Sequence, residues 1–234
     1  MRVLKVDNVL KADKRWDILH LLIEGSAKEA GYEITKRYLD VIVSLALLII
    51  ALPVLGAIAA VIKTTSRGPV LFRSKRLGRG GREYWCYKFR TMVPDAERQL
   101  LSYPDLQRQF FDGFKIKNDP RVTRPGAFLR KTSLDELPQL FNVLRGDMSL
   151  IGPRPMLPPE LDQRIDCYGS SHGDRLLSVK PGLGGIWQVS GRSDTSYAER
   201  IAMDMDYVAR RSIWLDSKLM FLTAIVVIRR RGAY

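Results

Sequence analysis

The sequence predicts a mostly helical α+β protein in which a membrane-embedded segment precedes a small soluble part. Residues 41–62 form a long apolar run without a charge. Further on, two strand-like runs flank a glycine-rich turn at 78–81, and most of the remaining chain carries helix start and stop patterns. The net charge of +13 indicates an anionic partner, for which nucleic acid, an anionic membrane surface and phosphorylated substrates all qualify.

The apolar run at 41–62 is long enough to enter a bilayer, and its all-round apolarity argues against a helix buried in a soluble core. Pro53 lies near its middle, where a proline kinks or breaks a helix. Basic residues flank the run on both sides, and the positive-inside rule places both flanks on the cytoplasmic face. We therefore predict a re-entrant helical hairpin over residues 37–64, broken at Pro53.

Residues 1–36 form an N-terminal arm with a short apolar patch at 16–23. This patch predicts half of an amphipathic helix, which lies either on the protein or on the membrane. No cleavable signal pattern is apparent. The soluble domain is expected to span residues 65–234.

The two runs at 70–76 and 83–90 predict a β-hairpin. A phosphate-cradling loop is the alternative, but the glycines lack fingerprint spacing and no helix follows them. In the second strand Lys88 and Arg90 alternate with aromatic residues, so both cations share one face.

Six further helices and one short strand are expected from capping residues and from hydrophobic periodicity. The last helix, 213–228, is too short and too interrupted by charge to span a bilayer, and it fits the membrane interface. The other helices are expected at 95–103, 105–114, 123–130, 133–144 and 196–211, and the strand at 149–151.

Asp135 and Glu136 are the candidate catalytic pair. Ser133 and Glu136 have capping-box spacing, which places both acids in a first helical turn and keeps them ionised. An ionised aspartate among cations can attack a phosphoryl group, and a neighbouring carboxylate can hold Mg²⁺. Taken alone, acids in a first turn are ordinary. Downstream, two prolines hold Arg154 in a stiff loop that suits a phosphate.

Three stretches together resemble one family. They are LRKTSLDELPQLFNVLRGDMSLIGPRP at 129–155, YKFRTM at 87–92 and KPGLGGIWQVSGR at 180–192. In this order they closely resemble the bacterial sugar transferases, the monotopic polyprenyl-phosphate hexose-1-phosphate transferases. The resemblance extends from about residue 36 to the C-terminus.

The resemblance implies a cytoplasmic catalytic domain at the bacterial inner membrane and a role in exopolysaccharide assembly. The donor would be a UDP-sugar, the acceptor undecaprenyl phosphate and the released product UMP. Asp135 would be the covalent nucleophile, and Glu136 would hold Mg²⁺ or Mn²⁺. The predicted phosphate-binding cations are Lys88, Arg90, Arg130, Arg145 and Arg154, and the predicted nucleotide-sugar contacts are Gly182, Gln188 and Arg192.

A non-catalytic, membrane-anchored scaffold for anions or lipids is the alternative, because charge alone allows it. No helix-turn-helix, zinc-finger or aromatic RNA-binding pattern is present, so we expect no nucleic-acid partner. Two cysteines are too few for a disulfide framework. A homodimer remains open, and the identity of the sugar is not predicted.

Overall fold

A computed structural model describes residues 6–113, 116, 119–191 and 195–229, and within these ranges it describes side chains from residue 28 onward except at 111–113. Contacts divide the chain into two compact units, Met1–Leu39 and Asp40–Tyr234. Helix α1, Val6–Thr65, contributes to both units. The predicted limits 1–36, 37–64 and 65–234 divide the chain into an arm, a membrane segment and a soluble domain. The division by contacts does not test these limits, and they stay predictions.

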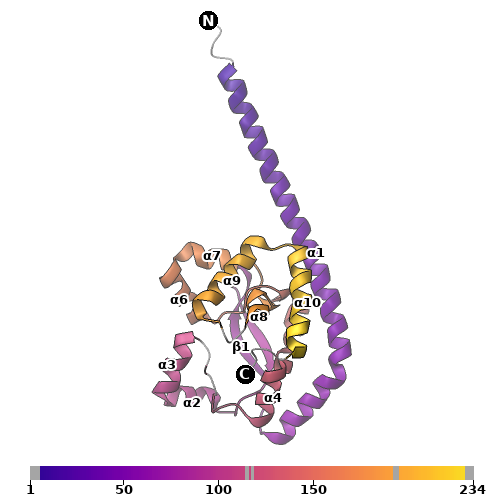
Figure 1. The fold of residues 1–234 in the computed structure, drawn as a ribbon, viewed down its shortest axis with the longest axis vertical. Coiled ribbons are helices and arrows are strands. Elements are labelled where there is room, and N and C mark those ends of the chain that lie inside the picture. Colours follow the sequence, from indigo (N-terminus) through magenta and orange to yellow (C-terminus); the bar gives the residue numbers. More distant parts are fainter. Residues whose placement is uncertain (1–5, 114–115, 117–118, 192–194, 230–234) are drawn as a thin grey trace. The chain divides into compact units, whose positions relative to one another are not determined.

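The part of α1 in the second unit has one buried side and one exposed apolar side. Leu48, Ile58 and Ile62 are buried, whereas Ile49 and Ile50 are 60% and 74% exposed. Pro53 lies inside the helix, which changes direction within this part of the ribbon (Figure 1). Among the described residues, one helical segment, 28–65, is long and apolar enough to cross a membrane. The re-entrant path stays a prediction.

The predicted β-hairpin is confirmed. Strand β1, Leu71–Leu77, pairs antiparallel with β2, Glu83–Phe89, and the short 3₁₀ turn η1, Arg79–Gly81, joins them. In this register Phe72 lies opposite Lys88. Because side chains alternate across a strand, Ser74, Arg76, Cys86 and Lys88 lie on one face of the hairpin.

The middle of the chain is helical, as expected. Helices α2, Ala96–Ser102, and α3, Pro104–Gly113, precede α4, Arg124–Thr132. Thr123 caps α4 by accepting a hydrogen bond from the Gly126 N–H at 3.1 Å, as its position before Pro125 predicted. Helix α4 continues two residues beyond the expected end at Arg130.

The core of the second unit surrounds a parallel strand pair. The predicted strand is present as β3, Ser149–Ile151, and it pairs with β4, Gly182–Gly184. Helices pack around it, and Leu140, Val143 and Met148 are at most 1% exposed. The helices in this core are α5, Gln139–Arg145; α8, Ile186–Ser190; α9, Tyr197–Arg210; and α10, Ile213–Arg229. Helices α6, Pro158–Tyr168, and α7, Ser170–Leu177, pack with α9 in a second buried cluster.

The last two helices confirm two further expectations. The Ser196–Glu199 capping box opens α9, with both reciprocal hydrogen bonds present. Helix α10 packs through buried Leu219 near Leu48 of α1 and leaves Trp214 and Phe221 78% and 69% exposed. Its location in a membrane interface stays a prediction.

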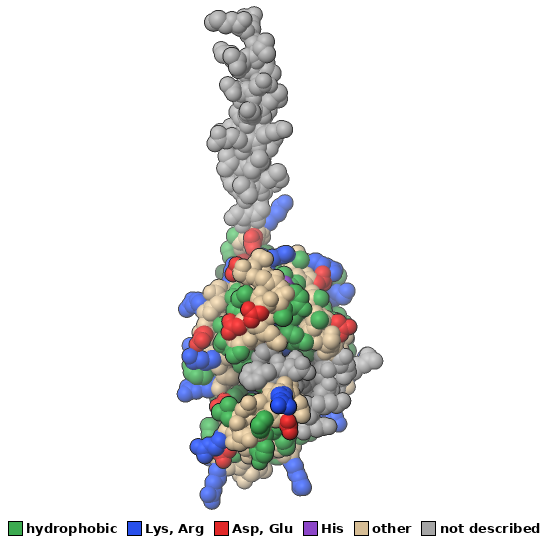
Figure 2. All heavy atoms as spheres, turned by 90° about the vertical axis from the view of Figure 1, so that its left-hand side faces the viewer, with side chains coloured by type: hydrophobic (Ala, Val, Ile, Leu, Met, Phe, Trp, Pro, Cys, Tyr) green, Lys and Arg blue, Asp and Glu red, His purple; other side chains and the backbone are tan. Residues whose placement is uncertain are grey.

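The surface in Figure 2 carries charges of both signs, scattered singly among hydrophobic and neutral polar side chains. The large positive net charge is therefore not concentrated in one patch on this face.

Candidate active site

The acid pair does not begin a helix in the way that the sequence suggested. Ser133 has a left-handed backbone, with φ 58° and ψ 16°, and its N–H closes α4 on the carbonyls of Arg130 and Leu129. It makes no side-chain cap, so the predicted capping box is wrong. A 3₁₀ turn, η2, follows at Leu134–Glu136, and α5 starts after Pro138, which has no N–H to continue the turn.

This turn buries Asp135, which is only 8% exposed. Burial and the neighbouring Glu136 charge raise the pKa of Asp135 to about 6, against the lowering effect of Lys88 and Arg130. The predicted stabilisation of its anion by a helix N-terminus is therefore outweighed. Within the described ranges Asp135 forms no ion pair. An unpaired buried carboxylate costs free energy, which is typical of functional sites.

Glu136, by contrast, has a direct partner. Lys88 Nζ, from β2, lies 2.5 Å from Glu136 Oε1. The sequence placed both residues in one site but did not predict that they form an ion pair. Both side chains remain partly accessible, at 22% and 30% of their surface. The pair is thus open to a ligand that could compete with it.

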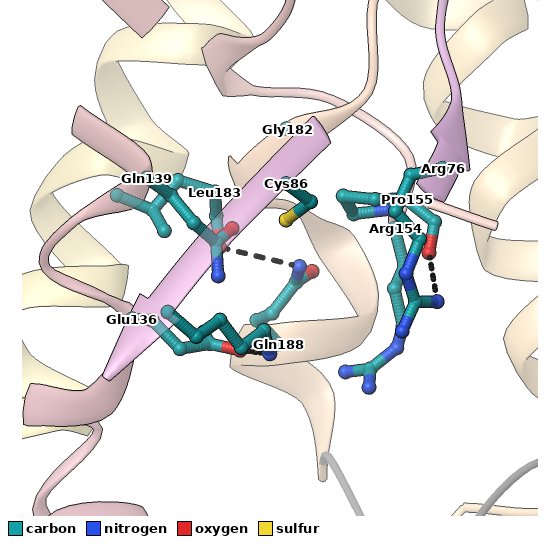
Figure 3. Close-up of a pocket in the computed structure, with 10 residues that line it drawn as sticks. Arg76, Cys86, Glu136, Gln139, Arg154, Pro155, Gly182, Leu183 and Gln188 are labelled. Carbon is teal, nitrogen blue, oxygen red and sulfur yellow. Dashed lines mark hydrogen bonds and ion pairs between the residues drawn. The ribbon is translucent and has the colours of Figure 1, made fainter. Parts of the chain in front are cut away.

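A pocket beside this ion pair gathers residues from five segments of the second unit (Figure 3). Glu136 lies on one side of the pocket and Arg154 on the other, and Lys88 lines the pocket as the ion-pair partner of Glu136. The lining residues are Arg76, Cys86, Lys88, Glu136, Gln139, Arg154, Pro155, Gly182, Leu183 and Gln188. Four predicted site residues besides Glu136 therefore meet here: Lys88, Arg154, Gly182 and Gln188.

Other predicted cations point elsewhere. Arg130 acts on Asp135 through its charge, while its Nε donates to Thr91 Oγ1 at 2.9 Å. Arg90 is buried and donates to the backbone carbonyls of Ser66 and Arg67, where it anchors the end of α1.

Arg145 is the most exposed of the predicted cations. Its Nε lies 3.8 Å from Asp147 Oδ2, and the Arg145 side chain is 65% exposed. Arg192 lies outside the described residues. The phosphate-binding roles assigned to Arg90, Arg130 and Arg145 stay predictions.

The loop that carries Arg154 is held against the loop at 180–185. Gly152 N donates to Gly184 O at 2.9 Å, and Gly182 N donates to Pro153 O at 2.8 Å. A Cβ on Gly182 would lie 2.0 Å from Gly152 N, so only glycine allows this approach. Glycine at this position thus serves the close approach of two backbones.

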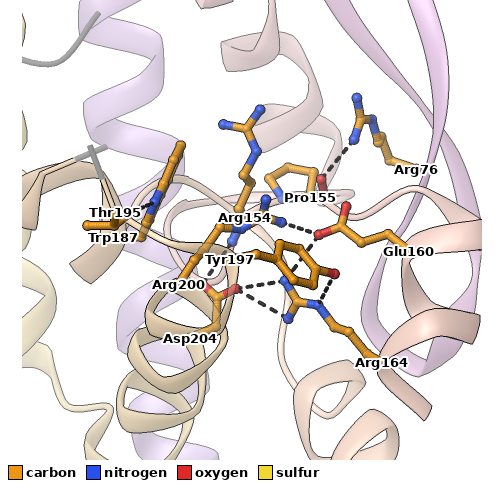
Figure 4. A network of polar contacts seen from close by, with 10 residues as sticks. All are labelled: Arg76, Arg154, Pro155, Glu160, Arg164, Trp187, Thr195, Tyr197, Arg200 and Asp204. Atoms are coloured by element: carbon orange, nitrogen blue, oxygen red, sulfur yellow. Dashed lines mark hydrogen bonds and ion pairs between the residues drawn. The ribbon is translucent and has the colours of Figure 1, made fainter. Parts of the chain in front are cut away.

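Arg154 is further positioned by Trp187 and Asp204 (Figure 4). Its guanidinium carbon lies 4.8 Å from the Trp187 ring centroid, and its backbone N–H donates to Asp204 Oδ1 at 3.4 Å. Trp187 Nε1 in turn donates to Thr195 Oγ1 at 2.7 Å. Through these contacts Trp187 has a structural role in holding Arg154.

Asp204 belongs to a buried ionic network that no motif had suggested (Figure 4). Arg164 Nη2, from α6, lies 3.1 Å from Glu160 Oε1 and 3.3 Å from Asp204 Oδ2. Arg200 also forms an ion pair with Glu160. All four side chains are at most 8% exposed, and two acids balance two cations. The network joins α6 to α9 directly behind Arg154.

Sequence reasoning missed Arg76 and Gln139 among the residues that line the pocket. Arg76 faces the pocket because the hairpin register puts it on the same side as Lys88. Gln139 is 3% exposed and lines the pocket from the start of α5. The alternation in the first strand could have indicated Arg76 once the register was known.

The donor set is compatible with one Mg²⁺. No group of three His, Cys, Asp or Glu side chains among the described residues is placed to hold a metal. Mg²⁺, however, commonly uses one or two carboxylates together with substrate phosphates and water. Adjacent Asp135 and Glu136, with the raised pKa of Asp135, fit a cation that accepts oxygen ligands.

Glu136 faces cations in a small pocket, and Asp135 is buried next to Glu136; this arrangement is suited to phosphoryl chemistry. Comparison with known proteins specifies the class. The family model described as bacterial sugar transferase matches residues 31–230, and the chain therefore belongs to that family. Membership of a transferase family favours the enzyme over the non-catalytic scaffold.

Among curated relatives, the chain is 43% identical over 93% of its length to an undecaprenyl-phosphate galactose phosphotransferase of Salmonella typhimurium. It is 41% identical over 90% of its length to the exopolysaccharide production protein ExoY of Rhizobium meliloti, of which it covers 92%. It is also 38% identical to a UDP-glucose:undecaprenyl-phosphate glucose-1-phosphate transferase of Xanthomonas campestris, over 93% of the chain and 43% of that protein. The chain spans only 45% of the Salmonella relative.

Proposed function

We propose that this protein transfers a sugar 1-phosphate from a UDP-sugar to undecaprenyl phosphate. The relatives named for undecaprenyl-phosphate transfer support the acceptor, and the Xanthomonas relative, named for UDP-glucose, supports the donor. The observation that carries the chemistry is Asp135, a buried carboxylate without an ion pair among the described residues, beside Glu136 and a cation-lined pocket.

In the proposed mechanism, a carboxylate oxygen of Asp135 attacks the phosphorus that bears the sugar. The bond from that phosphorus to the bridging oxygen of the diphosphate breaks, and UMP leaves with the electron pair. An oxygen of undecaprenyl phosphate then attacks the same phosphorus and releases the Asp135 carboxylate. Lys88 and Arg154 line the pocket where they can offset charge that develops on the phosphate oxygens.

Glu136, with Asp135 beside it, would hold the Mg²⁺. When bound, the ion would screen the two carboxylates from the incoming diphosphate and polarise its oxygens. Lys88, which pairs with Glu136 at 2.5 Å, balances the charge of that acid.

A membrane location follows from the substrates and from exposed apolar surface. In the second unit, α1 and α10 pack together through Leu48 and Leu219 and expose Ile50 and Phe221 outward. We propose that these surfaces face lipid at the cytoplasmic side of the bacterial inner membrane, where a soluble nucleotide sugar and an embedded polyprenol can meet.

The re-entrant path of residues 37–64 is proposed on Pro53 between two basic flanks. To test it, single cysteines would be placed at Arg2 and at Arg79 in a Cys167→Ser background, since Cys167 is exposed. Both should react only from the cytoplasmic side. Labelling at position 2 from the periplasm would establish a full span instead.

The activity is tested with purified protein, Mg²⁺, undecaprenyl phosphate and a panel of UDP-sugars. UMP release that depends on both the lipid and one sugar donor is expected. When the lipid is withheld, intact-protein mass spectrometry should find one sugar phosphate per chain. Absence of UMP release with every donor would contradict the proposal.

A further inference from the structure

Arg76 is a pocket cation to which no role has been assigned. It extends from β1 into the pocket, where its NH1 donates to Pro155 O at 3.1 Å and its Nε donates to Ser74 Oγ at 3.3 Å. A guanidinium carries five N–H donors, so these two bonds leave three for a ligand. The contact with Pro155 also fixes Arg76 beside the loop of Arg154.

Arg76 and Arg154 form an uncompensated pair of cations. Figure 3 shows both on the same side of the pocket, away from Glu136. Neither forms an ion pair among the described residues, although the charges of both reach the buried thiol of Cys86. Like charges held close together repel, and an anion between them removes that cost.

Gln139 adds a polar group to the same space. Its side chain is 3% exposed and lines the same pocket. The amide of Gln139 and the guanidinium groups of Arg76 and Arg154 thus line one space.

We propose that Arg76 binds substrate phosphate and forms, with Arg154, a two-guanidinium phosphate site opposite the Lys88–Glu136 pair. This inference rests on the proposed function for the identity of the phosphate, which belongs either to the donor diphosphate or to the lipid acceptor. Guanidinium groups bind phosphate through paired hydrogen bonds that an ammonium cannot reproduce.

The direct test uses pyrophosphate as the probe, with the full chain in detergent and titration calorimetry as the measurement. Arg76→Gln should weaken pyrophosphate binding by about tenfold or more. Arg73→Gln is the matched control, because Arg73 is on the opposite face of the same strand, over the Trp85 ring. The control should bind within about twofold of wild type. Equal affinity in the two variants would overturn the proposal.

A role confined to holding Pro155 predicts a different result. It would lower the melting temperature of Arg76→Gln and leave pyrophosphate affinity unchanged, which also overturns the proposal. If Arg76→Gln does not purify folded, Arg76→Lys replaces it. The lysine keeps the charge without the fork and should bind about fivefold more weakly, whereas wild-type affinity would contradict a phosphate fork.

Kinetics then distinguish the two sources of phosphate. A raised half-saturating UDP-sugar concentration for adduct formation in Arg76→Gln assigns the site to the donor. A raised KM for undecaprenyl phosphate, with normal adduct formation, assigns it to the lipid. If wild type forms no adduct and releases no UMP, the proposed function fails while the pyrophosphate result still decides the site.

Discussion

Two charged clusters in the second unit differ in how completely their charges are paired. In the network of Glu160, Arg164, Arg200 and Asp204, two buried acids face two buried cations. At the pocket, Asp135 is buried beside another acid and has no ion pair among the described residues. Paired charges hold a structure in place, whereas an unbalanced charge is available for a ligand or a reaction.

The first prediction removes the unbalanced charge. Asp135→Asn should lower turnover by roughly a thousandfold or more, because an amide cannot serve as the nucleophile. It should also raise stability. The pKa of Asp135 in the folded protein is about 6, above the ordinary value of 3.8. Ionisation of Asp135 therefore leaves the free energy of unfolding unchanged below about pH 4 and lowers it by the full amount above about pH 6. That cost is at most about 3 kcal/mol.

Turnover and thermal melting at pH 7.5 check this prediction together. Asp105→Asn, on the exposed first turn of α3, serves as the control and should change neither quantity. A variant at Asp135 that still forms the phosphosugar adduct would move the nucleophile assignment to Glu136 or to direct attack by the lipid.

The second prediction unbalances the paired cluster. Glu160→Gln leaves Arg200 without its acid and should destabilise the protein by about 3–5 kcal/mol. For a domain of this size the melting temperature should fall by about 6 °C or more. Asp206→Asn breaks an exposed pair with Arg210 on α9 and should cost at most about 1 kcal/mol. Equal melting temperatures for the two variants would mean that the buried network does not hold α6 to α9.

The third prediction concerns the metal. Glu136→Gln should lower turnover by about 10- to 100-fold and weaken the dependence on Mg²⁺, since the amide remains polar but loses its charge. Initial rates across a Mg²⁺ titration, for the variant and for wild type, provide the measurement. Full wild-type activity in excess EDTA would exclude the metal.

The fourth and smallest effect sharpens the electrostatics of Asp135. Activity should fall about tenfold per pH unit below pH 6, as the carboxylate takes up a proton. Lys88 lowers the pKa of Asp135, so Lys88→Met should shift this acid limb upward by less than about one unit. Profiles of kcat/KM against pH check both statements. Lys75→Met, which removes the exposed partner of Glu83, should leave the limb in place.

The sequence by itself determined the local elements and the candidate chemistry. Alternating side chains and a glycine turn specified the hairpin, and Thr123 and Ser196 specified two helix starts. The long run without charged residues at 41–62 specified the apolar part of α1. These features depend on residues close together in the chain, so their physical causes can be read locally. The motif around Asp135 likewise indicated the family that the comparison established.

Only the tertiary structure decided which charges meet and what they cost. Ser133 ends a helix instead of beginning one, because its left-handed backbone directs its N–H to the last carbonyls of α4. Arg90 turned to the end of α1, and Arg76 entered the pocket through a strand register that alternation alone leaves open. The pKa of Asp135 is raised because burial depends on every element packed around it, a sum that no single stretch of sequence contains.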